Sequence, residues 1–435
     1  MSVEPGAIAT AVVEMARAGR FAEIEKLFAP RLRAVVSAES LRVAWVAEAE
    51  RFGAIRGVGE PSSEPTDAAL VRVSVPVTGE RGGMTVVMSV DAAGLLNGFR
   101  LAPPPGSAWE APSYAESGRF TEYEITLGEG RLAVSGTVSV PRGRGAKPGV
   151  VLLSGGGPFD RDETSGPNKP LKDLAWGLAS RGIAVARFDL VTYTHPGLAA
   201  DLPEFTMTDE YVPYAVAAIQ LLQQHPAVDP ARVFVLGHSM GGKVAPRVAA
   251  AEPSVAGLVL LAADASPMQR SAVRVARYLA ALNPGAATES AVAMITEQAE
   301  RVDSPGLSVS TPAADLPFGL PGAYWLDLRG YDPVSTAAAL NKPMLILQGA
   351  RDYQVTVEDD LALWQAGLGE RPEVTIGIHD AGNHLFFPGS GASSPAEYEP
   401  AQHIDPAVIA QIADWLAPAP VRGRVGRLLS SLSRR

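Results

Sequence analysis

The segment VFVLGHSMGGKVAPRVAAAE (233–252) constrains the fold more than any other part of the sequence. A short apolar run, typical of a buried strand, meets a serine set between glycines and continues into a helical pattern. The motif Gly-x-Ser-x-Gly is common by itself, so its context carries the weight. Small residues beside Ser239 let a strand turn sharply into a helix, with the hydroxyl held clear of the backbone. The segment therefore predicts a sheet whose strands alternate with helices.

The chain around this segment keeps the same alternation from residue 116 to 418. Two runs that look antiparallel come first, and strand-like runs separated by helical patterns follow; they lie at 121–128, 132–141, 149–157, 182–190, 255–263, 343–350 and 373–379. This order predicts an α/β fold, a doubly wound and mostly parallel sheet with helices on both faces. Roughly 80 residues separate the strands at 255–263 and 343–350, far more than a simple crossover needs. The insertion, about 265–335, is predicted to form a helical lid over the C-terminal edge of the sheet.

The N-terminal part, residues 1–102, is predicted to be a separate small α+β domain. Helical patterns at 7–18, 21–29 and 37–53 precede alternating apolar runs bounded by turn residues. Ser37 or Ser40 is a candidate cap for the third helix. The proline-rich stretch 103–115 is then interpreted as the linker between the two domains.

Composition excludes several classes of function. The 435 residues carry a net charge of −10, which argues against nucleic acid as a partner because phosphate binding needs a basic face. There is no cysteine, so disulfides and thiolate chemistry are excluded and a cytoplasmic location is expected. We see no signal peptide and no membrane span. The tail 419–435 is basic, and either a solvated end or a helix that contacts anionic lipid would fit it.

A serine hydroxyl becomes a useful nucleophile only when a base removes its proton, so a histidine must accompany Ser239. His384 lies in a loop just after the last expected strand, where the order serine, acid, histidine requires the base. His379 and His403 remain as alternatives. His238, inside the motif, is expected to point away from the serine.

The acid that orients this imidazole should leave the end of the preceding strand. Asp352 occupies that place in PMLILQGARDYQV. Asp359 and Asp360 lie on the following helix and are expected to be solvated. Asp380 is too close in sequence to His384 to orient it easily.

An oxyanion hole completes the expected constellation. One donor should be the backbone N–H of Met240, directly after the nucleophile, and the other should come from the glycine-rich loop SGGGPFDRDE. Gly156 is the first choice in that loop and Gly157 the second. The acidic and basic residues 160–162 are interpreted as loop ion pairs near the mouth of the pocket. We predict no metal and no cofactor, because neither a Gly-Lys-Ser/Thr sequence nor metal-ligand spacing accompanies this loop.

The chain resembles the bacterial α/β-hydrolases of the dienelactone-hydrolase and acyl-peptidase-like group, in particular members with a fused nuclear-transport-factor-like or cystatin-like N-terminal domain. The blocks that carry the resemblance occur in order: SGGGPFDRDE, GPNKPLKDLAWGLASRGIAVARFD, VFVLGHSMGG, YWLDLRGYDP, LILQGARDYQV and NHLFFPG. The resemblance implies Ser239 as nucleophile, Asp352 as acid and His384 as base. One departure is Leu190-Val191, where such proteins often have a Lys-Arg pair, and it indicates a more apolar pocket.

These residues predict a serine hydrolase that cleaves a carboxylic ester, or an amide, through an acyl-enzyme. Two alternatives stay open: an acyltransferase or cyclase that uses the same acyl-enzyme, and a binding protein with a vestigial hydrolase fold. The expected partner is a small, fairly apolar acyl substrate, and the sequence leaves a homo-oligomer open. No reaction is assigned to the N-terminal domain.

Overall fold

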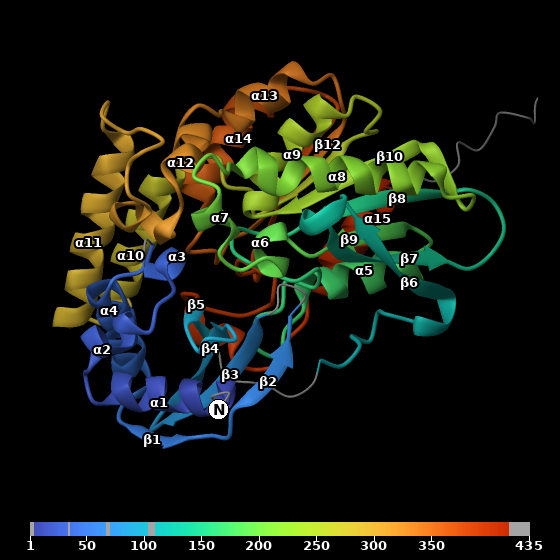
Figure 1. Cartoon of the computed structure of the whole chain (residues 1–435). Helices are drawn as coiled ribbons and strands as arrows, with labels where there is room; N and C mark the ends of the chain where they lie inside the picture. Colours follow the sequence, from blue (N-terminus) through green and yellow to red (C-terminus); the bar gives the residue numbers. More distant parts are fainter. Residues whose placement is uncertain (1–3, 34, 67–69, 103–108, 417–435) are drawn as a thin grey trace, which may run out of the picture.

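The structure is a computed structural model, and it describes residues 4–33, 35–66, 70–102 and 109–416. Two units are visible, each built on its own sheet (Figure 1). The expected tail at 419–435 and part of the expected linker, 103–108, lie outside the described residues. Among the described residues, no helix has the length and apolar character needed to cross a membrane.

The N-terminal unit packs helices on one face of an antiparallel sheet. Its elements are α1 (Pro5–Arg17), α2 (Phe21–Lys26), α3 (Pro30–Arg33), α4 (Ala38–Phe52), β1 (Ile55–Val58), β2 (Ser62–Pro65), β3 (Val71–Gly79), β4 (Gly82–Val90) and β5 (Leu96–Ala102). The strand order is β1-β3-β4-β5, with β2 also paired to β3. Alternate residues such as Val73, Val75 and Val77 are buried against the helices, as expected for a sheet with one covered face. The short α3 and β2 were not expected from the sequence.

Helix α4 begins where the sequence indicates. The Ser37 hydroxyl accepts a hydrogen bond from the Ser40 amide, and the Ser40 hydroxyl accepts one from the Ser37 amide. Both candidate caps therefore act together, because each side chain satisfies an amide that the first helical turn leaves unpaired.

The second unit is an eight-stranded sheet that confirms the expected α/β class. The strands are β6 (Phe120–Leu127), β7 (Val134–Pro141), β8 (Lys147–Leu153), β9 (Ala184–Phe188), β10 (Val228–His238), β11 (Leu258–Leu261), β12 (Met344–Gly349) and β13 (Val374–His379). Their order is β13-β12-β11-β10-β8-β9-β7-β6, and β8 to β13 run parallel wherever they pair with one another. The antiparallel strands β6 and β7 form one end. Because these strands are parallel, their carboxyl ends lie at one edge of the sheet. The strand order reverses direction at β8, and ligands bind at such a switch point on that edge.

Helices cover both faces of this sheet. The larger core lies beneath α8 (Met207–Gln224), α9 (Met240–Ala251), α13 (Pro333–Ala339) and α14 (Ala362–Leu368). A second core lies beneath α5 (Pro170–Ser180) and α15 (Pro406–Leu416). Because both faces are buried, strands such as β12 are apolar along almost their whole length, which explains the unbroken hydrophobic runs in the sequence.

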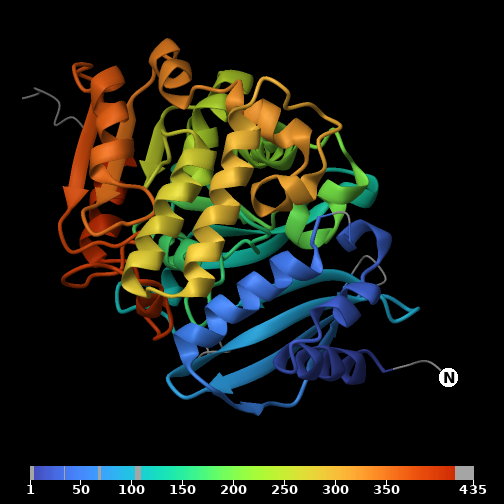
Figure 2. The ribbon, with the colours of Figure 1, turned by 90° about the vertical axis from the view of Figure 1, so that its left-hand side faces the viewer.

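The insertion between β11 and β12 forms a helical hairpin next to the N-terminal unit. It contains α10 (Met268–Leu282), α11 (Ala286–Asp303) and α12 (Gly322–Arg329), and α11 contacts α4 (Figure 2). The short helices α6 (Val191–Thr194) and α7 (Leu198–Asp201) follow β9. Arg72 of β3 donates to the Tyr193 hydroxyl of α6, and Arg31 forms an ion pair with Asp201 of α7. The N-terminal unit therefore contacts the second unit at both the insertion and the α6–α7 segment.

Candidate active site

Ser239 sits in a strained turn between β10 and α9. Its φ of 52° and ψ of −118° lie in a region that residues with a side chain rarely adopt. A Cβ on Gly237 would lie 2.1 Å from the Gly241 carbonyl oxygen, and one on Gly241 would lie 2.4 Å from that of Leu153. The two glycines of the motif are therefore required by backbone packing, and Ser239 itself remains partly exposed.

His384 and Asp352 meet at the same edge of the sheet. Nδ1 of His384 lies 2.7 Å from Oδ2 of Asp352, and both residues are buried. Asp352 follows β12 and His384 follows β13, which are neighbours in the sheet. With Nδ1 facing the carboxylate, Nε2 is the nitrogen left to exchange a proton with another group.

His238 connects this pair to the turn that carries Ser239. Its Nε2 donates to the backbone carbonyl of His384 at 2.9 Å, and the two imidazole centroids are 4.7 Å apart. Because His238 directly precedes Ser239, the loop of His384 lies beside the serine turn. The His238 side chain is buried, and its hydrogen-bond partners are Glu163 and the His384 carbonyl.

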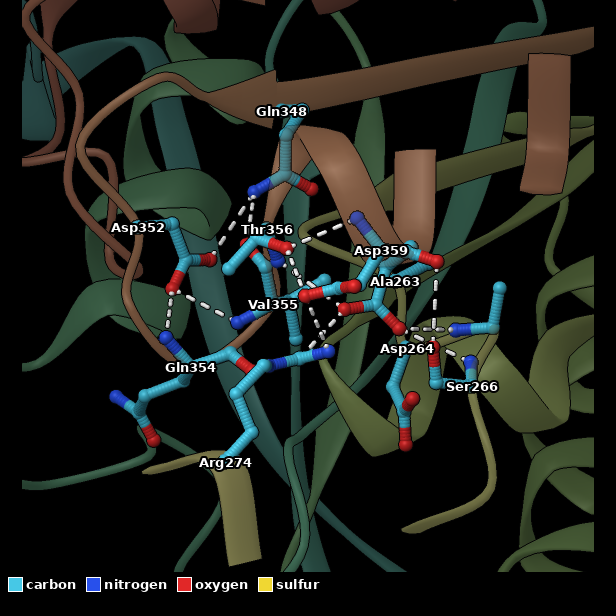
Figure 3. A network of polar contacts seen from close by, with 12 residues as sticks. Ala263, Asp264, Ser266, Arg274, Gln348, Asp352, Gln354, Val355, Thr356 and Asp359 are labelled. Carbon is cyan, nitrogen blue, oxygen red and sulfur yellow. Dashed lines mark hydrogen bonds and ion pairs between the residues drawn. The ribbon is translucent and has the colours of Figure 1, made fainter. Parts of the chain in front are cut away.

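The Asp352 carboxylate accepts four hydrogen bonds, and Figure 3 shows those from Gln348, Gln354 and Val355. Oδ1 accepts from the amides of Gln354 and Val355, and Oδ2 accepts from the Gln348 side chain as well as from His384. Four donors on its two oxygens hold this carboxylate in one orientation. It is therefore suited to hold an imidazolium during a reaction.

The glycine-rich loop after β8 lies directly beside the serine turn. A Cβ on Gly156 would lie 3.4 Å from the Met240 Cβ, and one on Gly155 would lie 3.4 Å from that of Ser239. The Gly155 amide already donates to Glu163, so it cannot serve an oxyanion. Gly156 and Gly157 are exposed, and Met240 begins α9, where its amide has no carbonyl one turn back. These observations leave the amides of the three residues as candidates for an oxyanion hole.

The two alternative histidines have other partners. His379 lies at the end of β13 and pairs with Gln411 of α15. His403 pairs with Asp173 of α5, which raises the pKa of its imidazole through that hydrogen bond and charge. Both contacts belong to helices on the face opposite α9, so neither imidazole replaces that of His384 at the serine turn.

The expectation that Asp360 is solvated is wrong. This residue is fully buried and accepts from the amides of Ala265 and Ser266, while Arg274 forms an ion pair with it. These contacts and the Arg274 charge outweigh burial and lower the pKa of Asp360. Only Asp359 is exposed, as expected. The helical pattern around Asp360 does not reveal these contacts, because they come from the insertion between β11 and β12.

The insertion is fastened to the loop that carries Asp352 (Figure 3). Arg274 of α10 donates to the Gln354 carbonyl and to Asp360. Tyr278, one turn later, stacks on Tyr353 with ring centroids 4.9 Å apart. Helix α10 of the insertion and the loop of Asp352 are thus packed against each other.

Two of the three charged residues at 160–162 form ion pairs, as expected, whereas Asp160 accepts hydrogen bonds from the Thr164 amide and hydroxyl. Arg161 pairs with Asp189, and Asp162 pairs with Arg187 and Lys169. These groups fasten the loop to β9 and α5. They are structural contacts that keep the exposed glycines in place.

A buried carboxyl, that of Asp264, lies just after β11. Burial raises the pKa of Asp264 to about 6, against the lowering effect of Lys243 at 3.2 Å. Nearby Asp360 raises it further because two carboxylates repel each other. The group holds a proton more readily than an ordinary aspartate.

Three residues of the site escaped sequence reasoning: Glu163, Gln348 and Asn383. Glu163 binds Gly155 and His238, and Gln348 binds Asp352. Asn383 is fully buried, and its side-chain oxygen accepts from two amides of the loop that follows His384. The glutamate in GGGPFDRDE and the asparagine before the histidine were visible, but their contacts join segments far apart in the chain. Among the described residues, no group of side chains could hold a metal ion.

Comparison with known proteins shows that the chain belongs to the alpha/beta hydrolase family. Residues 150–401 match the family model described as "Alpha/beta hydrolase family". Esterase EstD of Thermotoga maritima is 36% identical over 338 residues, which cover 78% of this chain and 77% of EstD. The putative esterase NocK of Nocardia uniformis subsp. tsuyamanensis is 30% identical over 196 residues, covering 40% of this chain and 53% of its own. The solved structure of Est1E from Butyrivibrio proteoclasticus aligns with a TM-score of 0.44 and 14% identity, over 67% of this chain and 97% of Est1E.

Proposed function

Because the chain belongs to the alpha/beta hydrolase family and is a carboxylesterase-like hydrolase, we propose that it cleaves a carboxylic ester through an acyl-enzyme on Ser239. The observation that carries the proposal is the 2.7 Å contact between Nδ1 of His384 and Asp352. It fixes the imidazole tautomer and leaves Nε2 to act as a base. Membership of an enzyme family sets aside the non-catalytic alternative.

In the proposed first step, the Ser239 oxygen attacks the ester carbonyl carbon while Nε2 of His384 takes the hydroxyl proton. The carbonyl oxygen becomes an oxyanion, which the amides of Gly156 and Met240 stabilise, with Gly157 as the other loop candidate. The bond to the alcohol oxygen then breaks, and His384 returns the proton to the leaving alcohol. A water that His384 deprotonates attacks the acyl-enzyme, releasing the free acid and restoring the serine.

The proposed substrate is a small and fairly apolar acyl ester. Leu190 and Val191 do not support this directly, because each is only 1% exposed and packs in the larger core. The support comes from the lid helix α10, where Val273, Val275 and Leu279 keep partly exposed apolar surface on the helix that contacts the acid loop. An apolar acyl chain gains free energy when it covers such surface.

Acyl transfer to an alcohol or amine, or ring closure, remains the second candidate, since it would use the same acyl-enzyme. The fastening of α10 to the acid loop favours it, because a closed lid slows the entry of water. Adding a primary amine during turnover separates the two. An amide product supports transfer, whereas free acid alone supports hydrolysis.

Two further features are proposed, one for the N-terminal unit and one for the location of the protein. The helices packed on one face of an antiparallel sheet support a nuclear-transport-factor-like or cystatin-like N-terminal unit. The absence of cysteine from all 435 residues supports a cytoplasmic location, where disulfides are rare.

The test is the pair of variants Ser239→Ala and His384→Ala. We expect each to lower turnover of a p-nitrophenyl ester by about 10⁴-fold or more, and the serine variant to lose labelling by a fluorophosphonate probe. His379→Ala and His403→Ala serve as matched controls and should keep wild-type turnover. Normal turnover in Ser239→Ala, or loss of turnover only in a control variant, would refute the proposal.

A further inference from the structure

A buried glutamate and histidine lie behind Ser239 without a part in the proposed proton transfers. Glu163 and His238 are 4% exposed each, and Oε1 of Glu163 lies 2.8 Å from Nδ1 of His238. Burying two such side chains is unfavourable unless they are paired and hydrogen-bonded. The presence of this buried pair beside the serine turn therefore needs an explanation.

The hydrogen bonds of this pair reach both loops that flank Ser239. Oε1 of Glu163 accepts from the Gly155 amide at 3.1 Å, one residue before the proposed oxyanion donor Gly156. Nε2 of His238 donates to the His384 carbonyl at 2.9 Å. One pair of side chains thus holds the backbone of the oxyanion loop and the backbone of the proposed base.

The partners of His238 also fix its charge. Both ring nitrogens face acceptors, a carboxylate and a carbonyl, so both must carry hydrogen while Glu163 is ionised. Burial opposes this charge, but Glu163, the His384 carbonyl and Asp352 together raise the pKa of His238. Three ionisable residues face the His238 imidazole: Glu163, Asp352 and His384. Glu163 and Asp352 carry the negative charge that compensates a protonated imidazole.

The backbone at Glu163 is strained. Glu163 has a φ of 54°, in the left-handed region that favours glycine, and its Oε2 is buried with no partner in the described part of the chain. Tyr211 meanwhile donates to the Gly155 carbonyl, so the N–H and the C=O of Gly155 are both held by buried side chains. Strain and an unpaired oxygen of this kind persist where the surroundings demand one geometry.

We propose that Glu163 and His238 are positioning residues, a buried ion pair that fixes the oxyanion amide and the His384 backbone relative to Ser239. The inference rests on the proposed acyl-enzyme chemistry. It assigns the pair no contact with substrate. Its role is to set the alignment of groups that act in the transition state, so its loss lowers kcat and leaves KM nearly unchanged.

The test compares Glu163→Gln with Glu210→Gln, the same substitution at another buried glutamate. Burial raises the pKa of Glu210, and its donors among the described residues are the hydroxyls of Thr192 and Tyr324, so a neutral amide suits its site. We expect Glu163→Gln to lower kcat for a p-nitrophenyl ester by about ten- to a hundredfold, with KM changed less than about threefold. Glu210→Gln should stay within about twofold of wild type. Equal kcat in the two variants would overturn the proposal.

A double-mutant cycle with His238→Gln tests whether Glu163 and His238 act as a unit. His238→Gln also provides a second test of the proposal if Glu163→Gln does not fold. If the two residues act together, the double variant is no slower than the slower single variant. Effects on kcat that multiply independently would overturn the pairing. Thermal unfolding measured by circular dichroism shows which variants are folded at the assay temperature, and kcat is compared among those.

The pH profile gives a readout that a packing role would not change. In the wild type, His238 keeps its proton to a raised pH, so kcat falls on the alkaline side as that proton is lost. Without the Glu163 charge, burial dominates, and this alkaline fall should move to lower pH in Glu163→Gln. A variant that is slower but has the wild-type profile would refute the ion pair. Failure of the hydrolase proposal looks different, since Ser239→Ala would then remain active.

Discussion

The two units of the protein differ in what they bury. In the described N-terminal unit, only Thr85 and Ser89 are buried polar residues, and the core is otherwise apolar. The second unit buries many ionisable side chains, among them Glu163, Asp264 and Asp360. Buried charges reduce stability unless they are paired, so they collect where a function requires them. The contrast locates the chemistry in the second unit and gives the first a packing role.

The same contrast appears in the backbone. Of the five described residues other than glycine with positive φ, none lies in the N-terminal unit. Ser239, Glu163 and Phe386 belong to the serine turn, the glycine-rich loop and the loop after His384. Strain is therefore concentrated in the segments that build the candidate site. An N-terminal fold with relaxed backbone and apolar core should tolerate change without loss of catalysis.

The largest expected effect follows from removing the charge of Asp352. Asp352→Asn keeps the shape of the side chain but presents an amide to Nδ1 of His384, which favours the wrong tautomer. We expect kcat for a p-nitrophenyl ester to fall by about 10⁴-fold. Asp380→Asn is the matched control, because that residue is exposed and close in sequence to His384. A control as slow as Asp352→Asn would locate the acid elsewhere.

The next effect tests the packing role of the N-terminal unit. Leu96 is fully buried in its core, so Leu96→Ala should lower the free energy of unfolding by about 2 to 5 kcal/mol. Below the unfolding transition, kcat should be unchanged. The control is Leu363→Ala, which removes a side chain that is 43% exposed and should change stability by less than about 0.5 kcal/mol. If the Leu96→Ala protein is folded but has a reduced kcat, the N-terminal unit contributes to catalysis, and the contrast drawn between the two units is wrong.

The smallest effect concerns the pH dependence of stability. Asp264 has a pKa of about 6 in the folded protein, above its unfolded value near 4, so the folded state holds a proton that the unfolded state releases between these values. Its contribution is therefore lost as the pH rises from about 4 to about 6, by at most about 3 kcal/mol. Urea unfolding across that window should give a smaller loss in Asp264→Asn than in wild type. Identical slopes would show that Asp264 titrates as an ordinary aspartate.

Much of the fold was predictable because local patterns agree with it. Helix α9, Met240–Ala251, follows β10 directly, as the helical pattern after the serine motif indicates. Residues 37 and 40 cap α4 through bonds within four residues of chain. The short α3 and β2 were missed, since segments of four residues have no period to detect.

In the candidate site, too, features that follow from local sequence were predictable and long-range contacts were not. Strand order brings Asp352 and His384 together, and the position of each after an apolar run was legible in sequence. The burial of Asp360 was not, because it depends on Arg274 from an insertion more than 80 residues away. The substrate remains a proposal, since Leu190 and Val191, on which the sequence argument relied, pack in the core.

The sequence by itself determined the alternation of strands and helices, the tight serine turn and the order of its partners, because these follow from periodicity and from glycines that leave no room for a side chain. Only the tertiary structure decided how the site is held. The bonds of Glu163 to Gly155 and His238, and of His238 to the His384 carbonyl, join segments up to 146 residues apart. Such contacts depend on where the sheet places its loops in space, and no local pattern encodes that.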